Sequence, residues 1–299
     1  MLPDTTSTPV VRALLASSLP DLPTKKLRLV LAGEEFDTWE ADGAVVKVPK
    51  TPESAAKLDR EVALSGLLAE RLGPLVPAVR AVGTAGDTFP YCSVAFERSR
   101  GRPGQTAEGQ MVRPKPWARN SLARDVAAAF SKLHSTPAKR AKADGAVKRP
   151  VDVDAMMDID QKAIARASKV VGDAVDRFLV DPIPAEARKG GAQALCHGDV
   201  KGEHLYVSED GGRLTGIVDW ADVAITDPAV DLAGLVIWLG ESFLAAVLDL
   251  YTGPADEGTL PRALFLARAG LLGYLQLQIA GEVDAPRALL DAQLRAAFE

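Results

Sequence analysis

The chain has 299 residues, of which 47% are hydrophobic and 25% are charged, and its formal net charge at pH 7 is −5. This length suits two modest lobes, and the composition excludes a collagenous or disordered chain. The negative charge offers no attraction to nucleic acid or to anionic membranes, which bind a concentrated positive face, so we expect neither as a partner.

The first hundred residues contain short β-type runs separated by turn signals. The runs that predict strands are residues 27–31, 36–41, 44–48, 78–83 and 91–97. Asp42-Gly43 lies between the second and third runs and predicts a hairpin, because this pair tolerates the positive φ angles of a tight turn. Residues 53–72 carry apolar side chains at helical spacing and predict a helix that lies across the resulting antiparallel sheet.

Residues 98–103 combine charge with turn formers and predict the connection between two lobes. We therefore expect an N-terminal lobe at residues 1–97 and a C-terminal lobe at residues 98–299. The second lobe is predicted to be mainly helical. Its expected elements are helices at 118–134, at 154–180 and from 228 to the C-terminus, a strand-rich segment at 194–218 and a solvated basic loop at 137–150.

The two cysteines, Cys92 and Cys196, each lie in an apolar stretch. Their number predicts neither a disulfide framework nor a four-ligand zinc site. Residues 1–9 lack the basic start and apolar core of a signal peptide. The apolar stretch 231–250 is interrupted by glycines and acidic residues and predicts two core helices rather than a membrane span. We expect a cytoplasmic monomer.

Asp199 and Asp219 flank a predicted hairpin within the strand-rich segment. Its strands are expected at residues 204–207 and 214–218, on either side of the turn Asp210-Gly211-Gly212. The two carboxylates therefore lie at the ends of the hairpin and can converge. Phosphoryl transfer needs a divalent metal on the phosphates, a carboxylate near the attacking hydroxyl and cations along the nucleotide. This segment can supply a metal site and the carboxylate.

His197-Gly198-Asp199, followed by His204 and then by Ile217-Val218-Asp219-Trp220, resembles the motifs of the aminoglycoside phosphotransferase and choline kinase superfamily. The resemblance implies that Asp199 is the catalytic carboxylate and that Asp219 binds Mg²⁺. The metal ligand between them is usually Asn, an oxygen ligand, whereas this chain has the nitrogen ligand His204. This departure resembles the macrolide phosphotransferase branch, in which histidine takes the same place. The segment at residues 214–220 is also similar to that branch.

The resemblance also implies an α+β, bilobal, protein-kinase-like fold. Its small N-terminal lobe, an antiparallel β-sheet with one helix, would bind the nucleotide. Its larger, mainly helical C-terminal lobe would hold the catalytic residues and the substrate. The segment Asp227-Pro228-Ala-Val-Asp231-Leu-Ala resembles a family motif as well, in which we read Asp227 as a helix cap and Asp231 as a brace for the catalytic loop.

Three further polar side chains lie in or near the motifs. Lys201 either neutralises a γ-phosphate oxygen or is a solvated surface lysine. His197 is expected to brace the catalytic loop by hydrogen bonds and to transfer no proton. His134, at the end of a predicted helix, is expected to be structural.

Lys47 lies in a predicted strand, and Glu61 lies in the helix that follows. The pair looks like the kinase arrangement in which a strand lysine holds the α and β phosphates and a helix glutamate orients it. Taken alone, a lysine in an alternating strand is more often exposed to solvent. Glu53 and Asp59 occupy the same helix and compete with Glu61 for this role.

Residues 91–98 are expected to form the last strand of the first lobe and the linker whose backbone reads the base. Phe96 and Arg98 are the nucleotide-binding candidates there. The loop at residues 32–36 has one glycine, Gly33, where protein kinases have three, and the Asp-Phe-Gly and Ala-Pro-Glu signatures are absent, which argues against a protein kinase. The macrolide branch implies GTP as the phosphate donor, with ATP as a possible substitute.

These features favour an antibiotic kinase that transfers the γ-phosphate of GTP or ATP to a hydroxyl of a macrolide amino sugar, resembling a macrolide 2′-phosphotransferase and inactivating the drug. The largely apolar C-terminal helices suit a macrolactone, although core residues would look the same. An aminoglycoside or amino-alcohol acceptor stays open, and so does a non-catalytic regulator that binds nucleotide.

Overall fold

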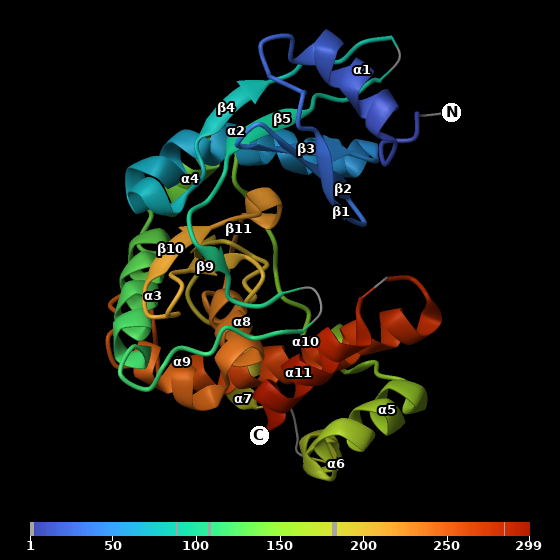
Figure 1. Ribbon diagram of the computed structural model, residues 1–299. Helices are drawn as coiled ribbons and strands as arrows, with labels where there is room; N and C mark the ends of the chain where they lie inside the picture. Colours follow the sequence, from blue (N-terminus) through green and yellow to red (C-terminus); the bar gives the residue numbers. More distant parts are fainter. Residues whose placement is uncertain (1–2, 88, 107–108, 181–183, 284) are drawn as a thin grey trace. The chain divides into compact units, whose positions relative to one another are not determined.

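The computed structural model describes residues 3–87, 89–106, 109–180, 184–283 and 285–299 (Figure 1). The chain divides into two compact units, Met1–Ser99 and Arg100–Glu299.

The first unit is built on one antiparallel sheet with the strand order β1-β2-β3-β5-β4. Its elements are α1 (Thr8–Ser18), β1 (Arg28–Ala32), β2 (Phe36–Ala41), β3 (Ala44–Pro49), α2 (Pro52–Leu72), β4 (Val79–Val82) and β5 (Val94–Glu97). The antiparallel sheet, the hairpin and the helix predicted at 53–72 are confirmed. Helix α1 was not predicted from the sequence.

Local chemistry explains two of these boundaries. Asp42 and Gly43 have φ angles of 48° and 84°, as the tight turn between β2 and β3 requires. Helix α2 begins with a capping box, in which the Thr51 side chain accepts a hydrogen bond from the Ser54 amide and the Ser54 side chain accepts one from the Thr51 amide. Pro52 occupies the first helical position. These contacts fix where β3 gives way to α2.

The two faces of the sheet have different partners. Trp39, Val46 and Val48 form one buried cluster with Val11 and Leu15 of α1. Because side chains alternate along a strand, residue 47 of β3 faces the opposite side, where α2 contacts the strand. The sheet therefore separates an apolar core on the α1 side from the side chain of residue 47 on the α2 side.

The second unit is mainly helical and contains two small three-stranded sheets, with strand orders β10-β9-β6 and β7-β11-β8. Its elements are β6 (Arg102–Pro103), α3 (Arg119–His134), α4 (Ala138–Ala143), β7 (Val147–Lys148), α5 (Gln161–Val171), α6 (Ala174–Val180), α7 (Ala185–Lys189), β8 (Ala194–Cys196), β9 (Leu205–Val207), β10 (Leu214–Ile217), β11 (Ala224–Thr226), α8 (Ala229–Leu239), α9 (Glu241–Leu248), α10 (Thr259–Ala280) and α11 (Arg287–Phe298).

Two expectations for this unit are corrected by the structure. The segment at 154–180 is not one helix, because α5 starts at an N-cap, Asp160, and ends at Gly172, whose φ of 63° breaks the helical path before α6. The segment at 137–150 is not simply a solvated loop, since it holds α4, the strand β7 and the buried Ala141.

Helix α8 is buried along most of its length and packs against α9, α10 and α11 (Figure 1). Among the described residues, α10 is the one helix long and apolar enough to cross a membrane by length and composition alone. Its apolar side chains pack on α8 and α5, as those of a core helix do. These packed helices form the hydrophobic core of the second unit, whose small sheets and connecting loops carry the candidate site.

Candidate active site

Asp199, His204 and Asp219 are brought together by the hairpin that the sequence predicted. β8 leads directly into residues 197–199, and the antiparallel pairing of β9 with β10 sets residue 219 beside the start of β9. The Val218 amide donates to the His204 carbonyl at 2.9 Å. As a result, His204 lies between the carboxylates, with Nδ1 3.6 Å from Asp199 Oδ2 and Nε2 3.5 Å from Asp219 Oδ2.

The hydrogen bond of His204 determines which of its ring nitrogens carries the proton. Nδ1 lies 2.7 Å from the Asp199 carbonyl oxygen, and a carbonyl only accepts, so Nδ1 is the donor. In the neutral ring the lone pair of Nε2 then faces the Asp219 carboxylate. A ring nitrogen and a carboxylate oxygen 3.5 Å apart can both ligate one cation. The pair therefore fits a metal ion held by one imidazole nitrogen and one carboxylate.

Asp219 adopts an unusual backbone conformation, with φ 65° and ψ 64° in the left-handed region. Left-handed φ angles at residues other than glycine cost on the order of 1 kcal/mol and concentrate at functional sites. The strained backbone of Asp219 therefore marks the turn after β10 as a candidate functional position.

Asp199 is an accessible carboxylate next to a lysine. Its side chain is 40% exposed, and Oδ2 lies 3.2 Å from Lys201 Nζ. Burial acts to raise the pKa of Asp199, but the positive charge of Lys201 and the imidazole of His204 outweigh it and hold the pKa below its ordinary value. Burial likewise acts to lower the pKa of Lys201, and the charge of Asp199 outweighs it and raises that pKa. At neutral pH the site therefore holds an ionised acceptor next to a cation.

Asp231 holds the loop that carries Asp199. Its Oδ2 accepts the His197 amide at 2.7 Å, and its Oδ1 accepts the Gly198 amide at 2.8 Å. Asp231 is fully buried, and burial acts to raise its pKa, but the hydrogen bond from His134 outweighs this and lowers the pKa. An ionised carboxylate at the N-terminal end of α8 thus ties the loop to the core of the unit.

The ring of His197 links the loop to the strand that precedes Asp219. His197 Nδ1 accepts the Asp199 amide at 3.3 Å, so Nε2 is the protonated nitrogen and donates to the Val218 carbonyl at 2.9 Å. The ring packs on Trp220 with centroids 4.5 Å apart, and burial lowers the pKa of His197. A neutral imidazole with both nitrogens engaged connects loop and strand, and no ring nitrogen is left for proton transfer.

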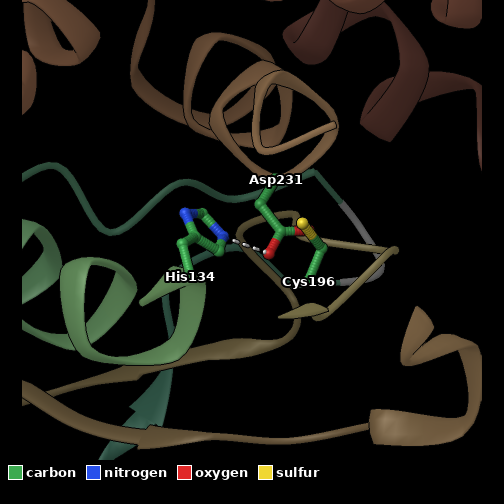
Figure 2. A group of neighbouring side chains, drawn as sticks. All are labelled: His134, Cys196 and Asp231. Atoms are coloured by element: carbon green, nitrogen blue, oxygen red, sulfur yellow. Dashed lines mark hydrogen bonds and ion pairs between the residues drawn. The ribbon is translucent and has the colours of Figure 1, made fainter. Parts of the chain in front are cut away.

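Figure 2 shows His134, Cys196 and Asp231 side by side, and one potential metal-ligand atom of each lies within 4.8 Å of the others. His134 Nε2 lies 3.0 Å from Asp231 Oδ2, and its Nδ1 is 2.7 Å from the Tyr251 hydroxyl. Burial raises the pKa of the Cys196 thiol well above its ordinary value, and its Sγ donates weak hydrogen bonds to the carbonyls of Ala194 and Thr226. These contacts are those of a hydrogen-bonded brace, with a protonated thiol in place of the thiolate that a metal binds.

Asp227 caps α8 and also reaches a second segment. Its Oδ1 accepts the Ala229 amide at 2.9 Å, and its Oδ2 accepts the Gly191 amide at 2.6 Å. Oδ2 also lies 2.9 Å from Nε of the buried Arg262. The side chain therefore joins the start of α8 to α10 and to the approach to β8.

In the first unit, Lys47 and Glu61 form a buried ion pair on the α2 side of the sheet. Lys47 Nζ lies 2.7 Å from Glu61 Oε2, and the two side chains are 11% and 6% exposed. The Lys47 ammonium also faces the rings of Phe36 and Phe96, with centroids at 5.3 and 5.6 Å. Arg98 has an exposed side chain that pairs with Glu40 at 2.8 Å. Of the competing acidic residues on α2, Glu61 is the one paired with Lys47.

The loop between β1 and β2 depends on its single glycine. The Gly33 amide donates to the Phe36 carbonyl at 3.0 Å, and a Cβ at Gly33 would lie 2.7 Å from that same oxygen. The turn is therefore too tight for a side chain at this position.

Comparison with known proteins places the chain in a family. Residues 26–265 match the phosphotransferase enzyme family, APH. The chain belongs to this family. The matched range includes Lys47, Glu61 and the whole segment from His197 to Asp231.

A curated relative of this chain is the viomycin phosphotransferase of Streptomyces vinaceus, which is 48% identical over 71 residues, or 23% of this chain and 24% of the relative. The chain spans less than half the length of the curated relatives it matches.

Solved structures resemble the chain over nearly its full length. The GDP and kanamycin complex of APH(2″)-IIIa has a TM-score of 0.73 at 19% identity and covers 96% of this chain and 98% of its own. The macrolide 2′-phosphotransferase MphH of Brachybacterium faecium has a TM-score of 0.64 at 23% identity, covering 95% and 97%. A ternary complex of APH(2″)-IIa with streptomycin and ATP has a TM-score of 0.60 at 18% identity, covering 99% and 96%. The protein-kinase-like fold is thereby confirmed.

The structure adds a residue to the candidate site that the sequence did not single out. Arg149 donates from Nη1 to Asp222 Oδ1 at 2.8 Å and from Nη2 to the Gly198 carbonyl at 2.6 Å. Arg149 belongs to the basic segment that was expected to be a solvated loop, and the sequence holds no motif that could have distinguished it from the neighbouring basic residues.

Proposed function

We propose that this phosphotransferase moves the γ-phosphoryl group of a nucleoside triphosphate to a hydroxyl group of a small-molecule antibiotic. The observation that carries the proposal is the arrangement of Asp199, an ionised and accessible carboxylate beside Lys201, next to the facing lone pairs of His204 and Asp219. Phosphoryl transfer needs these parts, and the family match supplies the reaction class.

In this proposal Asp199 orients the acceptor hydroxyl and accepts its proton as the oxygen attacks the γ-phosphorus. His204, through Nε2, and Asp219 would hold Mg²⁺, which when bound neutralises phosphate charge. Lys201, already beside Asp199, would face a γ-phosphate oxygen. His197 and Asp231 are assigned support of the loop, and Asp227 is assigned support of the start of α8, in agreement with their hydrogen bonds.

For the nucleotide we propose that Lys47, oriented by Glu61, binds the α and β phosphates, and that Phe96 and Arg98 belong to the region that meets the base. Lys47 suits this role because Glu61 and the two phenyl rings fix its ammonium in place. GTP is the favoured donor, supported by the GDP in the APH(2″)-IIIa complex, and the ATP in the APH(2″)-IIa complex keeps ATP as the alternative.

For the acceptor we propose a macrolide amino sugar, because His204 stands where that branch has histidine. The resemblance to MphH over 95% of the chain is compatible with this choice. A second candidate is viomycin or an aminoglycoside, favoured by the 48% identity with viomycin phosphotransferase over its aligned segment and by the kanamycin-bound neighbour.

The test of the reaction is a coupled assay of nucleotide consumption with GTP or ATP and Mg²⁺, against panels of macrolides, aminoglycosides and viomycin. Asp199→Asn should abolish acceptor-dependent turnover while nucleotide binding stays intact. Asp249→Asn, the same substitution at an exposed position, is the matched control. Turnover that survives in Asp199→Asn contradicts the role of Asp199, and binding without turnover on any panel favours a nucleotide-binding regulator.

The test of the metal site is the substitution His204→Asn, which replaces an imidazole nitrogen by an amide oxygen. Because Mg²⁺ prefers oxygen ligands and Mn²⁺ tolerates imidazole better, the variant should need less Mg²⁺ for half-maximal activity, relative to Mn²⁺, than the parent chain does. His204→Ala should raise the requirement for both ions. Identical metal requirements in all three proteins would remove His204 from the metal site.

A further inference from the structure

Arg149 connects the loop of Asp199 to the segment that follows Asp219, and it lies in neither sequence motif. One end of its guanidinium meets the carbonyl of Gly198, directly before Asp199, and the other end meets Asp222, which follows Asp219 in the chain. The side chains of Arg149 and Asp222 are 41% and 24% exposed. The pair therefore lies at the surface of the unit, where it can be changed without opening the core.

The small sheet β7-β11-β8 sets the position of Arg149. β8 runs into the loop of Asp199, β11 follows Asp222, and their antiparallel register pairs Cys196 with Ala224. β7 joins β11 in parallel, and the Arg149 amide donates to the Ile225 carbonyl at 3.1 Å. The strand β7, which lies outside both motifs, thus places Arg149 between Gly198 and Asp222.

Hydrogen bonds satisfy both polar groups of the peptide that joins Gly198 to Asp199. Its N–H, from Asp199, donates to His197 Nδ1, and its carbonyl accepts from Arg149. The carbonyl on the other side of Asp199 accepts from His204. Asp199 is consequently fixed on both sides of its Cα, and the guanidinium of Arg149 supplies a charged donor.

Gly198 shows how closely the guanidinium approaches the loop. Its φ is 86°, and a Cβ there would lie 2.3 Å from Arg149 Nη2 and 2.3 Å from the Asp222 carbonyl oxygen. A glycine at this position therefore serves two purposes, the left-handed turn and the contact with Arg149.

We propose that Arg149, paired with Asp222, is a positioning residue that fixes the distance between Asp199 and the His204–Asp219 pair, an inference that rests on the proposed function. Arg149 acts through the peptide before Asp199 and touches no substrate. A planar guanidinium can meet the carbonyl and the carboxylate at once, which a lysine ammonium does far less well.

The kinetic experiment compares Arg149→Ala, Arg149→Lys and Asp222→Asn with the parent chain. We expect kcat to fall about tenfold to a hundredfold in Arg149→Ala, with the KM for nucleotide changed less than about threefold, because the loss is one of alignment. Arg149→Lys should recover only part of kcat. Guanidinium chloride at about 20 mM should raise kcat of Arg149→Ala severalfold and leave the parent chain unchanged, by refilling the vacated contact.

Arg140→Ala is the matched control, since the Arg140–Asp144 pair has the same 2.8 Å separation and similar exposure. Kinetics of Arg140→Ala should equal those of the parent chain. A kcat of Arg149→Ala within twofold of the parent value overturns the proposal. So does a reduced kcat that guanidinium fails to restore and that falls in step with Tm.

A measurement without turnover separates this inference from the proposed function. Amide hydrogen exchange in a peptide covering residues 197–204 should be faster in Arg149→Ala than in Arg140→Ala, at equal Tm. Equal exchange overturns the positioning role. If the parent chain phosphorylates no acceptor, the proposed function fails, and the exchange result alone then decides for or against the contact.

Discussion

Gly234 offers a sharp test of the packing beneath the candidate site. It lies in α8, and a Cβ at this position would be 1.8 Å from the carbonyl oxygen of Val200, next to Asp199. The obstacle is backbone, so no rotamer change can relieve it. The Gly234→Ala substitution requires α8 and the loop to separate by about 1.6 Å before an ordinary contact of 3.4 Å is reached.

The expected magnitude follows from two opposing effects. Alanine gains about 1 kcal/mol over glycine in a helix interior, whereas overpacking costs about 1 to 3 kcal/mol and occasionally more. Because the contact is with backbone, we take the cost above that range and expect Gly234→Ala to lower the free energy of unfolding by about 3 kcal/mol. For a unit of this size that corresponds to a decrease of about 6 to 12 °C in Tm.

Gly273→Ala in α10 is the matched control, because a Cβ at Gly273 meets nothing within 4 Å. Gly273→Ala should raise the free energy of unfolding by about 1 kcal/mol, the difference in helix propensity between alanine and glycine. The assay is thermal unfolding by circular dichroism, with turnover measured at 25 °C. Equal Tm values for the two variants would refute the reasoning, since helix propensity alone predicts them equal.

Three further outcomes follow from the ion pairs. Asp231→Asn can accept only one of the two amides that the carboxylate holds, so we expect a loss of about 3 to 5 kcal/mol in urea unfolding. The charge of Lys201 lowers the pKa of Asp199 and so keeps the carboxylate ionised as the pH falls. Lys201→Met removes that charge and should raise the pKa of Asp199, which moves the acid limb of kcat/KM to higher pH. Lys47→Met should weaken nucleoside triphosphate binding by about 2 kcal/mol, roughly thirtyfold in Kd by titration calorimetry.

Each of these variants has a control of the same substitution at an exposed position: Asp249→Asn, Lys162→Met and Lys26→Met, respectively. An Asp231→Asn variant as stable as Asp249→Asn would mean that the loop does not depend on the carboxylate. An acid limb in Lys201→Met at or below that of the parent chain would contradict the sign of the pKa shift. Equal Kd values for the Lys47 and Lys26 variants would remove the phosphate role.

The strands and helices that sequence patterns predicted are those with local determinants. Residues 36–41 alternate and end at Asp42-Gly43, and the helix beginning at Pro52 is capped by Thr51 and Ser54, which lie three residues apart in the chain. Helix α1 was missed because its apolar side chains gain meaning only from the sheet face that they cover. The break at Gly172 was missed because glycine is also tolerated inside helices, and only the observed φ decides.

The candidate site divides in the same way. Asp199, His204 and Asp219 lie on one hairpin, so a sequence motif captures them, and Lys47 and Glu61 are separated by a single strand-to-helix connection. Arg149 reaches partners 49 and 73 residues further along the chain. A contact over such separations depends on how β7 joins its sheet, which periodicity and composition do not contain.

The two cysteines form a built-in pair of reporters. Cys92 is half-buried in the first unit, whereas Cys196 is fully buried in β8, where its sulfur faces the carbonyl of Thr226 in the neighbouring strand. A thiol reagent should therefore modify Cys92 in the native protein and reach Cys196 only when β8 parts from β11. The rate of the slow phase of labelling would measure the opening of the strand that leads into the loop of Asp199, without any engineered residue.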